Sequence, residues 1–272
     1  MPTTYSHYRF GCTVYNRLPK QEKESISQYR ELYDVGLHGP DLLFYYRPFS
    51  RNAVNQLGHQ MHHWTGRDVF TRAGEILLQQ QENKPLLAYI YGYLCHFVLD
   101  SMCHGYIEQK IRESGISHSE IEAEMDRALL VHDGYNPIKH CVTKHIIPSK
   151  QSAAVISQFY PDLSDDNIYE AMRSMVRFLN ILTAPSHIKR GLIFSVLTLA
   201  GQKKLCDLVI NYKYNSDCLD STEKLIKLYQ LAQPKAVDAI TSYLDMIHGQ
   251  GEFNSLFDLT FDPKPEEGII LE

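Results

Sequence analysis

Residues 91–104, "YGYLCHFVLDSMCH", form a largely apolar run in which three polar side chains recur at every fourth position: His96, Asp100 and His104. Side chains four residues apart lie on the same face of an α-helix, so these three form one stripe. A buried imidazole or carboxylate is costly unless it is hydrogen-bonded, paired with a charge or bound to a metal. The pattern therefore predicts a core helix with a functional polar stripe.

The spacing within the stripe indicates more than one metal ion. Because the helix rises about 1.5 Å per residue, the α-carbons of His96 and His104 lie roughly 12 Å apart, too far for both to hold one ion easily. Asp100 lies between them and has two oxygens, so it can serve each side or bridge. The sequence predicts a multinuclear site with ions at successive levels of the helix.

Other histidines extend this pattern. Eleven of the 13 histidines precede residue 146, His118 and Glu122 repeat the four-residue spacing, and "GHQMHH" supplies His59, His62 and His63. Imidazole and carboxylate ligands without cysteines favour zinc in a catalytic site. One buried histidine is more often a hydrogen-bonded core residue, but chance explains the whole set less well. Three others in this half, which fit no pair spacing, are interpreted as surface or structural: His132, His140 and His145.

Composition narrows the functional class. The apolar fraction of 44% and the charged fraction of 22% are typical of a soluble globular protein. The net charge is −5 and no block of Lys or Arg occurs, so we expect no nucleic-acid groove. No obligate protein partner is evident from the sequence. The first residues do not resemble a secretory signal, which makes a cytoplasmic location the expectation. The six cysteines form no CxxC pair and are expected to be reduced and mostly buried.

Helical spacing dominates the chain and predicts an all-α fold, a multi-helix single domain with an extra helical C-terminal half. A stretch of weaker periodicity at 132–164 divides a zinc-binding catalytic region, 1–145, from a helical region, 146–272, packed on the first. Gly115 is predicted to end one helix, and Ser117 with Glu120 to form a capping box for the next. The predicted helices are 5–18, 22–36, 52–81, 85–113, 118–131, 165–182, 188–199, 202–213 and 222–247.

Two apolar runs, 85–99 and 191–201, fall short of the 18 or so residues that span a bilayer. The second run could contact a membrane surface transiently, but a buried helix is the favoured interpretation. The tail "DPKPEEGIILE" is rich in proline and glutamate and is expected to be poorly ordered.

Five segments in order resemble the zinc-dependent phospholipase C family, whose superfamily includes zinc-dependent single-strand nucleases. They are "SHYRFG", "GPDLLFYY", "GHQMHHW", "HFVLDSMCHGYI" and "HSEIEAEMDRALL", and they cover roughly residues 5 to 131. The resemblance implies three zinc ions per chain. It assigns His62, His96 and Asp100 to one ion of a close pair, His7 and Asp100 to the other, and His104, His118 and Glu122 to the third. It also implies that Asp41 orients or deprotonates the attacking water.

The chain departs from the secreted members of this family, whose mature N-terminal tryptophan binds zinc. No such tryptophan occurs here, and we hypothesise that the Pro2 amine, freed by removal of Met1, replaces it. His59 is an alternative to His62 as a ligand. The C-terminal half resembles no β-sandwich lipid-binding domain and is predicted to be helical.

The resemblance implies a phospholipase C-like phosphodiesterase that acts on a phospholipid or a small phosphodiester. Next to Asp41, the side chains of Tyr45, Tyr46 and Arg47 could contact the substrate, by cation–π contact with a quaternary ammonium and by pairing with phosphate. Packing of these aromatic residues into the core is the slightly favoured alternative. A nuclease on the same scaffold and a non-catalytic zinc-binding helical protein are the other two hypotheses.

Overall fold

The computed structural model describes residues 4–81 and 83–267, and within these ranges the chain forms helices and no β-strand. One isolated antiparallel bridge joins Thr65 to Thr260. The all-α prediction is therefore confirmed. The α-helices are α1 (Thr4–Arg17), α2 (Lys20–Ser27), α3 (Arg30–Gly36), α4 (Ala53–Met61), α5 (Gly66–Gln79), α6 (Lys84–Ser114), α7 (His118–His132), α8 (Lys150–Ile156), α9 (Asp165–Leu182), α10 (His187–Leu199) and α11 (Leu219–Ile247). The 3-10 helices are η1 (Gly39–Tyr45), η2 (Ser157–Phe159), η3 (Lys203–Leu208), η4 (Ser216–Cys218) and η5 (Ser255–Asp258).

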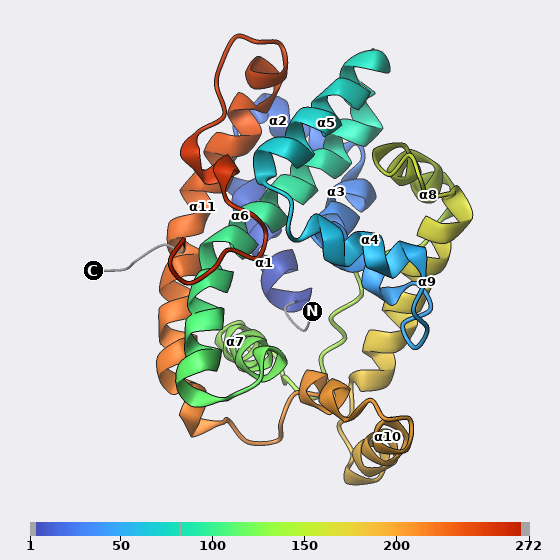
Figure 1. Cartoon of the computed structure of the whole chain (residues 1–272), viewed down its shortest axis with the longest axis vertical. Helices are drawn as coiled ribbons and strands as arrows, with labels where there is room; N and C mark the ends of the chain where they lie inside the picture. The colour runs from blue at the N-terminus through green and yellow to red at the C-terminus, as the bar shows by residue number, and fades with distance from the viewer. Residues whose placement is uncertain (1–3, 82, 268–272) are drawn as a thin grey trace.

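Helix α6 runs through the middle of the molecule and is surrounded by the other helices (Figure 1). It begins at Asn83, whose side chain accepts a hydrogen bond from Leu86 N–H, and it ends at Gly115, which adopts the left-handed conformation (φ 72°). All side chains from Leu86 to Gly105 are buried, as expected for a helix that is apolar on every face. This confirms the predicted core helix and its end at Gly115.

Helix α3 crosses α6 at very close range because both helices carry a glycine at the crossing. A Cβ atom on Gly36 would lie 2.3 Å from Tyr89 O, and one on Gly92 would lie 2.1 Å from Tyr33 O. No other residue fits there without moving a backbone. This crossing places the turn after α3, which carries Asp41, against the polar stripe of α6.

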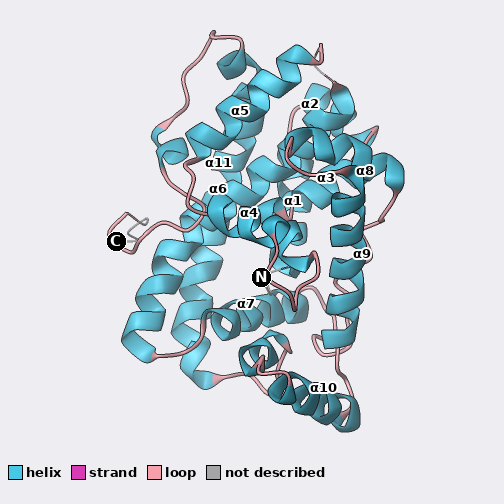
Figure 2. Ribbon diagram, turned by 45° about the vertical axis from the view of Figure 1, so that its right-hand side comes forward, coloured by secondary structure: helices cyan, strands magenta, loops and turns pink. Residues whose placement is uncertain are grey.

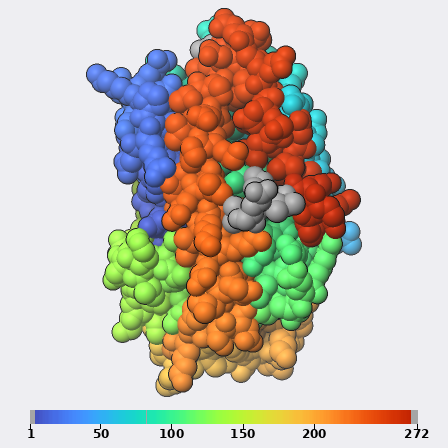
Figure 3. Space-filling model, turned by 90° about the vertical axis from the view of Figure 1, so that its left-hand side faces the viewer, coloured from blue at the N-terminus to red at the C-terminus, as the bar shows by residue number. Residues whose placement is uncertain are grey.

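Helix α11 lies alongside α6 and also contacts α1 and α7. In Figure 3 it forms a ridge along the molecule, with the blue N-terminal helices on one side. Tyr243 of α11 donates a hydrogen bond to Phe70 O of α5 (2.9 Å). One hydrophobic cluster includes residues from both the N-terminal and the C-terminal halves, so the two halves share a core.

Several details of the predicted helix pattern are wrong. The predicted 22–36 and 52–81 helices are each two helices, interrupted near Gln28 and at 62–65, and 202–213 contains only the short η3. Helix α8 was missed within the stretch of weak periodicity. Ser117 does cap α7 by accepting from Glu120 N–H, whereas the Glu120 carboxylate accepts a hydrogen bond from Asn215.

Helix α6 is also the one candidate membrane span among the described residues, by length and composition alone. Its most apolar window is entirely buried inside the protein. A core helix meets the same criteria, so the burial of α6 favours the core interpretation over a membrane span.

Candidate metal centre

Three groups of histidine and carboxylate side chains meet around the polar stripe of α6. Within each group, one ligand atom per residue lies within 4.8 Å of the others. The groups are His7, His96 and Asp100; Asp41, His62 and His96; and His104, His118 and Glu122. The structure thus brings together all eight residues that the sequence pattern and the resemblance selected within the described chain.

Asp100 lies at the centre of the first group. Its Oδ1 atom is 3.1 Å from His7 Nε2, and its Oδ2 atom is 2.9 Å from His96 Nε2. The two imidazoles stack, with ring centroids 4.4 Å apart. Asp100 Oδ1 also lies 3.6 Å from His104 Nε2, one turn further along α6. One carboxylate therefore faces histidines on both sides, as the bridging interpretation requires.

The second group joins η1 to the end of α4. His62 Nε2 lies 3.0 Å from Asp41 Oδ1. Gly39 precedes Asp41 with φ 48°, and a Cβ atom there would lie 2.1 Å from the His96 ring. A glycine is therefore needed both for the backbone turn and for the approach of η1 to His96. This places Asp41 beside His62 and His96, within reach either of an ion or of a water held there.

The third group lies between α6 and α7. Glu122 Oε1 is 3.2 Å from His118 Nε2 and 3.5 Å from His104 Nε2. A fourth side chain, Asp262 of the segment after η5, lies 3.2 Å from His104 Nδ1. Sequence reasoning missed Asp262, because it is the first residue of the tail that was expected to be poorly ordered; at this residue that expectation is wrong.

Four histidines of these groups have an oxygen near Nδ1, which leaves Nε2 directed at the group. The backbone oxygens of Gly58 and Leu37 lie 2.7 Å from His62 Nδ1 and 3.2 Å from His96 Nδ1. For the other two histidines the nearby oxygen belongs to a carboxylate. Asp262 lies beside His104 Nδ1, and Glu108 lies 3.7 Å from His118 Nδ1. Metal-ligating histidines commonly have such partners, which fix the tautomer and the orientation of the ring.

Helix α1, which carries His7, is held at its N-terminus by α7. Asp126 accepts hydrogen bonds from the backbone N–H groups of Tyr5 (3.1 Å) and Ser6 (2.8 Å) and from the Ser6 hydroxyl (2.6 Å). These are amides that a helix start leaves without partners in the helix. Burial raises the pKa of Asp126 to about 7. Pro2, the hypothesised amine ligand, lies outside the described residues.

The charges in the site depend on one another. Burial opposes ionisation of Asp100, but the imidazoles of His96, His104 and His7 lower its pKa well below the usual value. Burial likewise opposes a charge on His104, yet Asp100, Asp262 and Glu122 raise its pKa. The pKa of His118 is raised to about 9, since Glu122 and Glu108 outweigh its burial. The buried carboxylates therefore need positive charge beside them, which protons on imidazoles or metal ions can supply.

These residues fit zinc on three grounds. The donor set is imidazole nitrogen and carboxylate oxygen, which zinc prefers in catalytic sites. His7 Nδ1 and His96 Nε2 are buried without a hydrogen-bond partner, although His96 Nε2 points at Asp100 from 2.9 Å. The third ground is the hydrogen bonds of His62 Nδ1 and His96 Nδ1 to backbone oxygens, which hold these two rings in place before any ion binds.

A cavity of about 330 Å³ opens onto these groups. Asp41, His62, Asp100, His104, His118, Glu122 and Asp262 supply its polar wall. Phe44, Leu205 and Leu208 supply apolar surface, the last two from η3. A pocket with clustered polar groups on one side and apolar groups on the other suits a small amphipathic ligand.

The structure does not bring Tyr45, Tyr46 and Arg47 into the lining of this cavity. Tyr45 and Tyr46 are buried, and Tyr46 accepts a hydrogen bond from Asn167 of α9. The exposed Arg47 lies over the Tyr46 ring and pairs with Glu170. Tyr45 and Tyr46 therefore pack into the core, which was the slightly favoured alternative to substrate contact.

The alternative histidines of "GHQMHH" occupy the rim of the cavity. His59 and His63 are exposed and belong to none of the three groups, whereas His62 is buried. His145, interpreted as surface or structural, is buried and hydrogen-bonds to His38 (Nε2 to Nε2, 2.8 Å).

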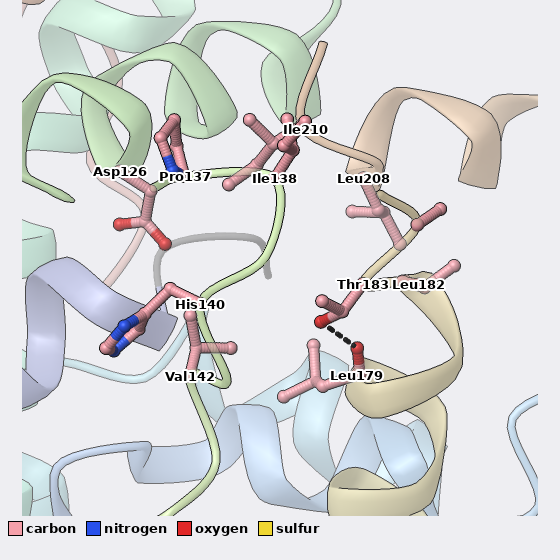
Figure 4. A pocket seen from close by; sticks show the side chains of 11 residues that line it. Asp126, Pro137, Ile138, His140, Val142, Leu179, Leu182, Thr183, Leu208 and Ile210 are labelled. Carbon is pink, nitrogen blue, oxygen red and sulfur yellow. Dashed lines mark hydrogen bonds between the residues drawn. The ribbon is translucent and has the colours of Figure 1, made fainter. Parts of the chain in front are cut away.

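A second cavity lies between α9 and the loops that follow α7 and η3 (Figure 4). Leu179, Leu182, Leu208 and Ile210 line it, with Asp126 and His140 at one side. Its volume of about 50 Å³ is room for one or two water molecules. The larger cavity at the metal groups is therefore the candidate for substrate.

Comparison with protein-family models gives a match to zinc dependent phospholipase C over residues 6–174, more than half of the chain. The match includes all eight residues of the three groups and excludes Asp262, α10 and α11. Searches of the curated proteins and of the solved structures give no match. The chain belongs to the zinc-dependent phospholipase C family.

Proposed function

We propose that this protein is a zinc-dependent phosphodiester hydrolase that uses three zinc ions to cleave a phospholipid or a small phosphodiester. The observation that carries the proposal is the meeting of three histidine and carboxylate groups at one cavity in a member of this family. The location in the cytoplasm and the division of the chain near residue 145 stay predictions.

Each ion would be held by residues from different parts of the chain. His7, His62, His96 and Asp100 would hold a close pair, with Asp100 between the two ions. His104, His118 and Glu122 would hold the third. Zinc, when bound here, would polarise phosphate oxygens, lower the pKa of a bound water and stabilise the leaving alkoxide.

Asp41 would orient the attacking water or accept its proton. Burial opposes its ionisation, but the hydrogen bond and the charge of His62 contribute to a lowered pKa, so the carboxylate is ionised at neutral pH. In that state Asp41 is a hydrogen-bond acceptor at the wall of the cavity. The Gly58 carbonyl holds the His62 ring, which in turn fixes the position of Asp41.

The cavity favours a phosphodiester with an apolar part. The polar wall would face the phosphate, while Phe44, Leu205 and Leu208 would contact the apolar part of the substrate.

To test the proposal, the zinc-loaded protein is given two substrates, p-nitrophenyl phosphorylcholine and phosphatidylcholine in detergent micelles, and the hydrolysis of each is measured. Release of phosphocholine and diacylglycerol identifies phospholipase C chemistry. Asp41→Asn should lower kcat by about a hundredfold or more, the range expected when a general base is lost. Asp238→Asn, an exposed carboxylate on α11, is the matched control and should leave kcat unchanged.

Three results would contradict the proposal. If the protein released nucleotides from single-stranded DNA but did not hydrolyse the phospholipid or the small phosphodiester, the nuclease hypothesis would be favoured. Bound zinc with no hydrolysis of any of these substrates would favour a non-catalytic zinc protein. Equal activity of the Asp41→Asn variant and the wild type would remove the role given to Asp41.

A further inference from the structure

Helix α10 carries apolar side chains on two opposite faces. Its inner face is formed by Arg190, Ile193 and Leu197, which are buried. Arg190 holds this face in place, because it donates hydrogen bonds to the backbone oxygens of Val209 (3.1 Å) and Ile210 (2.7 Å). The structure thus already covers one apolar face of α10, as the sequence predicted for a buried helix.

The outer face is equally apolar but uncovered. Ile188, Leu192, Val196 and Leu199 follow one another at helical spacing, with exposed fractions of 87%, 65%, 56% and 89%. Ile181, near the end of α9, is 54% exposed. The prediction that this run forms a buried helix is therefore wrong for half of its surface. Four large apolar side chains in one exposed stripe are unusual for a surface that meets only water.

The segment around this stripe is basic, in contrast to the rest of the chain. Between Glu170 and Asp207 there is no acidic residue, although the whole chain has a net charge of −5. The basic residues of this segment are Arg173, Arg177, Lys189, Arg190, Lys203 and Lys204. Lys203 and Lys204, at the start of η3, and Arg173 and Arg177 on α9 are exposed. Apolar side chains flanked by exposed cations match a surface of anionic lipid headgroups.

The stripe is continuous in the chain with the metal cavity. Helix α10 ends at Leu199, and η3 begins four residues later with Lys203 and supplies Leu205 and Leu208 to the cavity wall. Ser117, the cap of α7, donates a hydrogen bond to Asp207 (2.8 Å) and so holds η3 beside His118. Figure 2 shows α10 at one end of the molecule, next to α7 and the end of α9.

We propose that the outer face of α10, with Ile181, Arg177, Lys203 and Lys204, docks on a phospholipid membrane that contains anionic lipid. Docking brings the metal cavity to the lipid surface, and to this extent the inference rests on the proposed function. The chemistry divides between the two kinds of side chain. The apolar stripe enters the boundary between headgroups and acyl chains, and the lysines and arginines pair with headgroup phosphates and carboxylates.

Two other occupants explain the surface less well. A second copy of this chain would bring the same cations together across a two-fold axis, where they repel one another. A single-stranded nucleic acid would pair with the cations but would leave the aliphatic stripe exposed, since bases stack on aromatic side chains.

The test is flotation of the zinc-loaded protein with vesicles of phosphatidylcholine, with and without phosphatidylserine. Wild type should bind the mixed vesicles more tightly than the neutral ones. Ile188→Gln with Leu192→Gln should weaken binding to both by about tenfold or more, and Lys203→Glu with Lys204→Glu should weaken binding to the mixed vesicles by a similar factor. Leu219→Gln with Leu231→Gln, exposed leucines of α11, is the matched control and should bind as wild type does.

The outcomes separate docking from catalysis. If the Ile188/Leu192 variant hydrolyses p-nitrophenyl phosphorylcholine normally but hydrolyses vesicle lipid slowly, both proposals stand. If the wild type hydrolyses nothing and the variants still lose vesicle binding, docking stands and the proposed function fails. Equal vesicle binding by wild type and both variants overturns docking. A dimer that the Ile188/Leu192 variant dissociates, or single-stranded DNA binding that the lysine variant abolishes, without vesicle binding in either case, also overturns it.

Discussion

Asp262 Oδ1 lies 3.2 Å from His104 Nδ1, so the C-terminal segment touches the central helix at the ligand stripe. The contact comes from outside the part of the chain that matches the family. Phe261, directly before it, is fully buried against His96 and Phe97 and holds the segment in place. We therefore expect Asp262 to position His104 for the third group from behind.

Asp262→Asn should weaken zinc binding at the third group by about 10- to 100-fold, the range seen when a carboxylate behind a metal-binding histidine is removed. Competition with a chromophoric chelator measures this affinity without reference to activity. Glu266→Gln, which removes an exposed partner of Arg112 on the same segment, serves as the control. Unchanged zinc affinity in Asp262→Asn would show that His104 is positioned without it.

Gly39→Ala should disturb the metal pair more than it disturbs the fold. The new Cβ would lie 2.1 Å from His96 Cδ2 in a backbone with φ 48°. Overpacking and left-handed strain together should lower the free energy of unfolding by about 2–4 kcal/mol and displace His96 from its group. Urea unfolding and zinc content of the purified variant measure the two effects.

Gly115→Ala separates strain from the steric clash. Gly115 has φ 72°, but a Cβ there meets nothing within 4 Å. It should cost only about 1 kcal/mol and keep the full zinc content. If the two variants behaved alike, the close approach of Gly39 to His96 would not matter for the site.

The buried pair of His38 and His145 should make the fold sensitive to acid. Burial and the neighbouring imidazole of His145 lower the pKa of His38, and burial with the charge of Arg30 lowers the pKa of His145 to about 3. Below pH 6.5 the unfolded chain therefore binds protons that the folded chain does not, and stability is lost as pH falls. At pH 5.5 the loss is about 1.4 kcal/mol for His145, and His38 adds to it in the same direction.

Urea unfolding of the chelator-treated protein at pH 7.5 and pH 5.5 measures this loss without release of zinc. His145→Gln should lose less stability than wild type between the two pH values, by about 1–3 kcal/mol. His187→Gln replaces an exposed histidine and should lose as much as wild type. The same loss in His145→Gln as in wild type would place the acid sensitivity elsewhere.

The ligand stripe and the helical class could be predicted from the sequence because both depend on local spacing. His96, Asp100 and His104 share a face on any α-helix, and so do His118 and Glu122. The choice of His62 within "GHQMHH" could not be made this way, since it depends on where α4 ends relative to Asp41. The resemblance supplied His7 and Asp41, which share no helix with the stripe.

Contacts between distant segments account for most of what the sequence did not predict. Asp262 is separated from His104 by most of the C-terminal half, and no periodicity links them. In the sequence, α10 looks like an ordinary apolar helix. Both faces of the helix are apolar, and only tertiary packing decides which face is covered. The substrate roles predicted for Tyr45, Tyr46 and Arg47 assumed that neighbours of Asp41 face the same cavity, whereas η1 turns Tyr45 and Tyr46 into the core.

The central claim is a zinc cluster bridged by Asp100, and elemental analysis of the purified protein tests it most directly. Wild type should contain about three zinc ions per chain. Asp100→Asn should lose about two of them, because its carboxylate faces His7 and His96 from its two oxygens. Near-zero zinc in the wild type, or an unchanged zinc content in Asp100→Asn, would contradict the account.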